Sequence, residues 1–179
     1  MKPTQRNALF TATCLLAFGY SASATAEKPL DDLEIAHAAY NADLIDIKYA
    51  NIALEKSQDP DIREFAKLMV QDHTAVNEGA AALLKKLGAT PKDNPFSKAL
   101  NKGADTKVAE FSKLEGKAFD KAYADNELGY HQVVNKTVAG WIQIIKTPEL
   151  KTFMQNALVT FKVHEDHAGQ MVNKLANNP

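Results

Sequence analysis

The chain has 179 residues, a length typical of one domain, with 21 Lys and Arg against 22 Asp and Glu and a net charge of −1. This balance argues against a nucleic-acid partner, because binding to a phosphate backbone requires a basic surface. The one cysteine, Cys14, has no second cysteine with which to form an internal disulfide.

Residues 1–26 have the pattern of a secretory signal peptide. Two basic residues precede an apolar run over about 8–20, which is shorter than the roughly 20 residues of a transmembrane helix. Ala24-Thr25-Ala26 matches an A-x-A cleavage motif and predicts cleavage after Ala26; Ala22-Ser23-Ala24 is the second candidate. We therefore expect a periplasmic or secreted protein with no integral membrane segment after cleavage.

Removal of residues 1–26 would take away Cys14, two basic groups and no acid, which changes the net charge from −1 to −3. The remaining chain, 27–179, is expected to form a single domain. Because it has no thiol, any metal site in it must be built from histidines and carboxylates.

The composition of this domain, rich in Ala, Leu, Lys and Glu and poor in Gly, favours helices. Apolar residues recur at spacings of three and four, and prolines fall between the periodic segments. The pattern predicts four long helices, over about 30–57, 60–86, 117–146 and 148–175.

The connection between the second and third helices, 89–115, is long for a loop. We expect one short helical piece in it, around 108–114. A connection of this length is suited to running along the whole bundle before the next helix begins. The predicted fold class is therefore all-α, a four-helix bundle with a long crossover between helices two and three.

Each predicted helix carries ionisable residues within its apolar stripe. Because these residues lie within about one turn of the helix midpoints, helices of equal length would bring them together at one height. We call this set the polar layer: Asp43 and Asp46 from the first helix, His73 from the second, Glu127 and His131 from the third, and His164 from the fourth.

Imidazole and carboxylate groups together suit Zn, Fe, Mn, Ni or Cu(II), which leads to the hypothesis that the layer binds one transition metal ion. Asp72 and His167 are candidate hydrogen-bond partners of the ligands. The alternative is a purely structural layer, in which the histidines bond to the acids and fix the register of the helices. His37 lies on the polar face and is expected to be solvent-exposed, and we expect neither a haem nor a nucleotide cofactor.

The chain resembles the secreted, mostly bacterial, ferritin-like family known as domain of unknown function 4142. The resemblance extends from about Leu30 to Leu175. Its carriers are R-E-F-A-K-L-M-V-Q-D-H (63–73), L-E-G-K-A-F-D-K-A-Y (114–123), His131, and P-E-L-K-T-F (148–153) with His164 downstream. The resemblance implies a ferritin-like four-helix bundle with a long crossover and export from the cytoplasm, but no biochemical role.

Two departures bear on function. The family usually has a glutamate where Asp46 stands, so the carboxylate here is one methylene shorter. The di-iron pattern of ferritin-like proteins requires Glu-x-x-His on two helices, but Val70, Leu128 and Phe161 precede the layer histidines by three positions. We therefore expect a non-catalytic metal-binding bundle. The alternatives are a metal-free envelope or stress protein acting through an unknown protein partner, and a metal-dependent oxidase or peroxide-detoxifying enzyme.

Overall fold

A computed structural model describes residues 28–177, and this part of the chain contains five α-helices and no strand. The helices are α1 (Asp32–Lys56), α2 (Pro60–Lys86), α3 (Pro95–Phe111), α4 (Gly116–Ile144) and α5 (Pro148–Asn177). The all-α prediction is confirmed for these residues. The proposed signal peptide, with Cys14, lies outside them.

The ends of the long helices follow from local sequence. At the start of α1, Asp31 accepts hydrogen bonds from the backbone N–H groups of Leu33 and Glu34, and the Glu34 side chain bonds back to the Asp31 N–H. This reciprocal arrangement satisfies N–H groups that have no partner within the helix. Asp59 caps α2 in a similar way, ahead of a proline at the first helical position.

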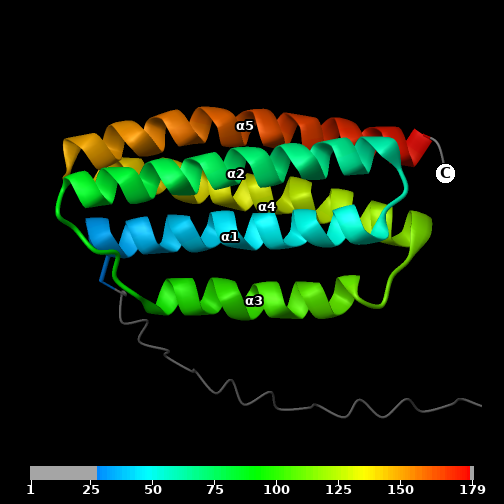
Figure 1. Ribbon diagram of the computed structural model, residues 1–179, viewed down its shortest axis with the longest axis horizontal. Helices are drawn as coiled ribbons and strands as arrows, with labels where there is room; N and C mark the ends of the chain where they lie inside the picture. The colour runs from blue at the N-terminus through cyan, green and yellow to red at the C-terminus, as the bar shows by residue number, and fades with distance from the viewer. Residues whose placement is uncertain (1–27, 178–179) are drawn as a thin grey trace, which may run out of the picture.

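Four long helices, α1, α2, α4 and α5, pack side by side, and α3 lies against α1 on the outside of this group (Figure 1). Helices α1 and α2 form one antiparallel hairpin and α4 and α5 form another, each joined by three residues. The two hairpins face each other through the pairs α1–α4 and α2–α5. Residues from all four long helices therefore meet along one central axis.

The connection between α2 and α4 runs the length of the bundle as expected (Figure 1), but its helical content is larger than the sequence predicted. Helix α3 has 17 residues, whereas the prediction was a short piece around 108–114. Pro95 begins this helix instead of interrupting it, because the Asn94 side chain accepts a bond from the Ser97 N–H and Pro95 occupies the first position.

The added length of α3 also corrects the expectation for His37. This side chain is partly buried, because α3 covers the outer face of α1, and its Nδ1 lies 2.9 Å from the Ser97 hydroxyl. A face that appears polar in the sequence of α1 is therefore a helix–helix contact.

The apolar interior is divided into two clusters along the bundle. One contains Tyr49, Phe65, Met69, Phe111 and Tyr123, and the other contains Ile35, Leu84, Val138, Ile142 and Met154. In sequence position the polar layer lies between them on α2, α4 and α5, and on α1 it lies at the edge of the first cluster, next to Ile45. Among residues 28–177, no helix combines the length and the apolar character needed to cross a membrane.

Candidate metal centre

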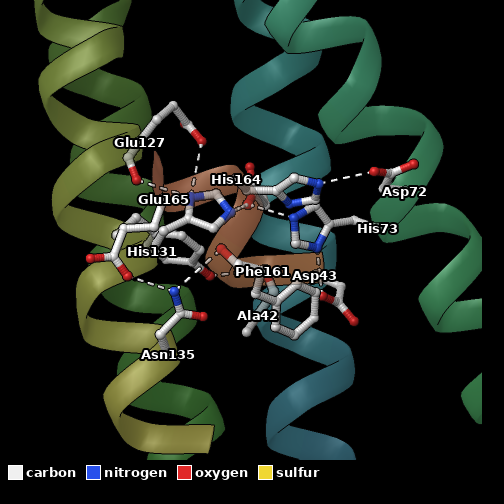
Figure 2. A network of polar contacts seen from close by, with 12 residues as sticks. Ala42, Asp43, Asp72, His73, Glu127, His131, Asn135, Phe161, His164 and Glu165 are labelled. Carbon is white, nitrogen blue, oxygen red and sulfur yellow. Dashed lines mark hydrogen bonds and ion pairs between the residues drawn. The ribbon is translucent and has the colours of Figure 1, made fainter. Parts of the chain in front are cut away.

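The polar layer that the sequence predicted is assembled inside the bundle (Figure 2). Helix α1 supplies two aspartates, α2 and α5 one histidine each, and α4 a glutamate and a histidine. The exposed fractions are 0% for Asp46 and Glu127, 1% for His131 and His164, 2% for His73 and 5% for Asp43. Charged and polar groups are this deeply buried only when they are paired or bind an ion.

The three histidines form a triangle of rings. The ring centres of His73 and His164 lie 5.1 Å apart, those of His131 and His164 5.4 Å, and those of His73 and His131 5.7 Å. One ring nitrogen from each histidine lies within 4.8 Å of the other two. Imidazoles from three different helices are thus within reach of a single ion.

Each of these rings uses one nitrogen to bond to a group at the edge of the layer. The contacts are His73 Nδ1 to Asp43 Oδ1 (2.7 Å), His131 Nδ1 to the Glu127 carbonyl oxygen (2.9 Å) and His164 Nε2 to Asp72 Oδ2 (2.9 Å). All three partners are acceptors, so these nitrogens carry the proton. Metal-ligating histidines almost always make such a bond, because it fixes the tautomer and the orientation of the ring.

The other nitrogen of each ring has no hydrogen-bond partner although it is buried; these atoms are His73 Nε2, His131 Nε2 and His164 Nδ1. Asp46 Oδ2 lies 3.0 Å from the first and 3.3 Å from the second. The groups are close, but neither pair is aligned as a hydrogen bond. Three unpaired nitrogens and a carboxylate oxygen therefore remain at the centre of the layer.

A second group of donors, Asp46, Glu127 and His131, shares this space and also brings one atom from each residue within 4.8 Å. Asp46 Oδ1 and Glu127 Oε2 are buried with no partner in the described structure. Burial, the Asp46 charge and a hydrogen bond to Asp46 raise the pKa of Glu127 well above its usual range. Without a metal, burial beside the Asp46 carboxylate therefore favours the neutral form of Glu127.

The charges of the layer are set by Asp46. Burial opposes its ionisation, but His73 and His131 together with the Glu127 hydrogen bond hold its pKa below the usual range. Burial likewise opposes charge on His73, yet the two aspartates outweigh it and raise the pKa of His73 to about 10. In the absence of a metal, His73 is the protonated ring.

The other two histidines are neutral. Burial lowers the pKa of His131, and it lowers that of His164 to about 4 against the opposing effect of the hydrogen bond that His164 donates to Asp72. The protonated ring of His73 adds to both shifts by repulsion. Neutral imidazole is the form that binds a metal.

Two predicted site residues lie elsewhere than expected. Asp43, predicted as a ligand, faces the outer nitrogen of His73 and so positions that ring instead of meeting the central nitrogens. His167 is exposed and lines a groove between α2 and α5, so it does not bond to the layer. Asp72 accepts a hydrogen bond from His164, one of the candidate ligands.

Phe161 and Asn135 belong to the surroundings of the layer, and the sequence analysis did not single out either. The Phe161 ring stacks on His73 at 5.0 Å with an interplanar angle of 11°. Asn135 Nδ2 bonds to the Phe161 carbonyl oxygen at 3.2 Å and to Glu165 Oε2 at 2.6 Å (Figure 2). Their spacing was the available signal, because Phe161 precedes His164 by three residues and Asn135 follows His131 by four.

Solved structures with a similar fold include two chains, each of which covers 82% of this chain and is itself covered to 99%. One is the crystal structure of a DUF305 fragment from Deinococcus radiodurans, with a TM-score of 0.69 and 15% identity. The other is CopM in the Cu(II)-bound form, with a TM-score of 0.62 and 11% identity. At these identities the likeness concerns the helical fold alone.

A comparison with curated proteins finds no match. A family model matches residues 19–171, which span most of the chain and include every residue of the polar layer. The chain therefore belongs to the family described as Domain of unknown function (DUF4142).

Proposed function

We propose that this protein is an exported, non-catalytic metal-binding bundle that holds one transition metal ion among His73, His131, His164 and Asp46. The observation that carries the proposal is the hydrogen bonding of the three histidine rings. Each donates its outer nitrogen to an acceptor and leaves its inner nitrogen buried without a partner. A buried polar nitrogen without a partner is costly, and an ion in the centre, which would displace the inner proton of His73, would satisfy all three nitrogens at once.

The contacts of Asp46 support a common ion. Nitrogen and oxygen ligands lie about 2.0–2.2 Å from zinc, so two ligands of one ion are about 3.3–3.6 Å apart at a tetrahedral angle and about 2.8–3.1 Å apart at a right angle. The separations from Asp46 Oδ2 to His73 Nε2 and His131 Nε2 are 3.0 and 3.3 Å, without hydrogen-bond alignment. Separations of this size agree with those expected of neighbouring ligands of one ion.

The donor set favours copper(II) and zinc among the candidate metals. Imidazole nitrogens bind Zn, Cu, Fe and Ni well, and Mn prefers oxygen ligands. The affinity of such sites generally rises to a maximum at Cu(II). The fold is also shared with CopM, whose solved structure contains Cu(II). We therefore place copper(II) first and zinc second.

The burial of the three histidines favours a metal-binding role over a catalytic one. The rings of His73, His131 and His164 are 1–2% exposed, and the narrow cavities beside Asp43 and Phe161 have volumes of about 30 and 20 Å³. Space of this size holds about one or two water molecules. Catalytic metal sites keep an open position for a substrate, and this arrangement is closer to a fully enclosed site.

The direct test is the metal content of protein purified without an affinity tag, stripped with a chelator and then equilibrated with Cu(II) or Zn(II). We expect one ion per chain. The variant H73A/H164A should lose it, whereas H37A/H167A, which also removes two histidines, should keep it. A wild-type protein that retains no stoichiometric ion and gains no thermal stability from any of the five candidate metals would overturn the proposal.

A metal-free structural layer is the second candidate, and one observation favours it. His73 lies between two carboxylates, 2.7 Å from Asp43 and 3.0 Å from Asp46, so a proton on this ring already pairs with both. The two candidates differ in proton release. Binding of Cu(II) at pH 7 should displace about one proton, from His73. Calorimetry in two buffers of different ionisation enthalpy measures this number, and the structural candidate predicts no binding heat at the layer.

The proposed place of action is outside the cytoplasm, and the signal-peptide pattern of residues 1–26 supports it. We also propose that the bundle is ferritin-like, since four long helices with a long connection along α3 match that architecture. Mass spectrometry of protein from a secreting host should find a chain that begins at Glu27. A chain that stays in the cytoplasm with residues 1–26 attached would contradict export.

A further inference from the structure

The polar layer meets solvent at one of its hydrogen bonds, on the face between α2 and α5. Among the acids that face the three rings, Asp43 and Asp46 have side-chain exposures of 6% and 0%, whereas the Asp72 side chain is 27% exposed. Asp72 accepts the bond from His164 Nε2 at 2.9 Å (Figure 2). The His164–Asp72 contact is thus the part of the layer that water can reach.

The outer surface beside this contact is hollow. A groove of about 550 Å³ runs along α2 and α5, and its lining includes Leu68, Gln71, His167 and Met171. Gln71 is adjacent to Asp72 in the sequence, and His167 lies three residues beyond His164 on the same helix. Asp72 and His164 do not themselves line the groove, but Gln71 and the exposed imidazole of His167 place one part of it within about one helical turn of the contact.

The other hollows that reach the layer are unsuited to an ion. Two narrow cavities of about 30 and 20 Å³ lie on either side of α1, and both are lined by Asp43 and Phe161 among mostly apolar side chains. A cation passing through them would lose its water shell with almost no polar group to replace it, which is strongly unfavourable. The groove between α2 and α5 is lined mostly by polar and charged side chains instead.

We infer that the metal ion reaches the layer from the groove between α2 and α5, passing Gln71 and His167 and entering where the His164–Asp72 hydrogen bond opens. This inference rests on the proposed function. On this route, His167 lines the path by which the ion enters and is not a ligand in the final metal site. Residues on an approach change the rates of binding and release together and leave the equilibrium affinity unchanged, whereas ligands change the affinity.

The experiment measures Cu(II) binding by stopped-flow fluorescence of Trp141 at low ionic strength, using the metal-free full-length protein. The variants Gln71→Glu and Gln71→Lys add one charge beside Asp72. The matched variants Gln132→Glu and Gln132→Lys add the same charges at an exposed position next to His131 on α4. Nearby charges alter the association of ions through local concentration, and the effect falls with added salt.

We expect Gln71→Lys to slow association roughly threefold to tenfold and Gln71→Glu to accelerate it by a similar factor. The Gln132 pair should change the rate less than about twofold. His167→Gln should slow association and release equally, with an unchanged dissociation constant. Equal effects of the Gln71 and Gln132 pairs, or an unchanged rate in His167→Gln, would overturn the route while leaving the metal site intact. Absence of Cu(II) binding by the wild type is the separate failure of the proposed function.

Discussion

The two apolar clusters and the polar layer between them use the same four helices in different ways. Around Phe111 and Tyr123, rings pack edge to face or stacked at 5.6–6.3 Å, and stability comes from apolar surface removed from water. In the layer, five side chains that are each at most 2% exposed carry polar atoms without partners. Such a layer costs stability, and its presence in the middle of a well-packed bundle supports the proposed binding role over a packing role.

This comparison predicts the largest loss of stability in the apolar cluster. Phe111 is fully buried and connects α3 to Tyr49 and Phe119. Phe111→Ala should lower the free energy of unfolding by about 3–5 kcal/mol. Urea denaturation measures the change. Metal content at 25 °C should equal that of the wild type. A loss of metal in a variant that remains folded would contradict the view that the apolar cluster and the polar layer have separate roles.

The next largest effect is expected in the layer. His73→Leu leaves Asp43 and Asp46 buried without their shared partner, so the metal-free protein should lose about 3 kcal/mol. Adding Asp46→Leu removes one of the stranded acids, and the double variant should recover part of the loss. Denaturation of both variants tests this. If the double variant is less stable than His73→Leu, the layer contributes to stability in the way the apolar clusters do.

The layer also predicts a dependence on pH that the apolar clusters lack. Because the pKa of His73 rises from 6.5 in the unfolded chain to about 10 in the fold, its protonation stabilises the fold. The contribution is complete below pH 6.5 and disappears as the pH rises through about 10. The stability difference between metal-free wild type and His73→Leu should therefore shrink from pH 6.5 to pH 10. Thermal melts across this range check the trend, and a constant difference would contradict it.

The smallest effect is expected on the surface. Lys48 and Asp105 form an ion pair at 3.1 Å between α1 and α3, with side-chain exposures of 47% and 75%. Lys48→Gln should change stability by less than about 1 kcal/mol, because water screens such pairs. Metal binding should be unaffected. A loss above about 1 kcal/mol in the same denaturation assay would contradict the screening of this pair by water.

The sequence predicted where each layer residue lies along the bundle axis. It did not predict which way each side chain points within the layer. Residues near four helix midpoints had to meet, and Asp46, His73, Glu127, His131 and His164 do meet. Which nitrogen of His73 faces which aspartate depends on how far each helix is rotated about its axis, and this rotation is set by packing against neighbours.

The same reason explains two other differences between sequence and structure. His167 lies about 60° around α5 from His164, enough to place it in the groove instead of the layer. The length of α3 was underestimated because the sequence analysis treated most of 89–115 as a loop, although a proline at the first position, here Pro95, is compatible with a helix.

The central claim is that the three inner nitrogens and Asp46 Oδ2 surround an ion. Anomalous diffraction from crystals of the full-length protein equilibrated with Cu(II) tests it most directly. We expect one strong peak, about 2.0–2.2 Å from His73 Nε2, His131 Nε2, His164 Nδ1 and Asp46 Oδ2. A map with no peak among these atoms, or with peaks only on the surface near His167 or His37, would contradict the claim.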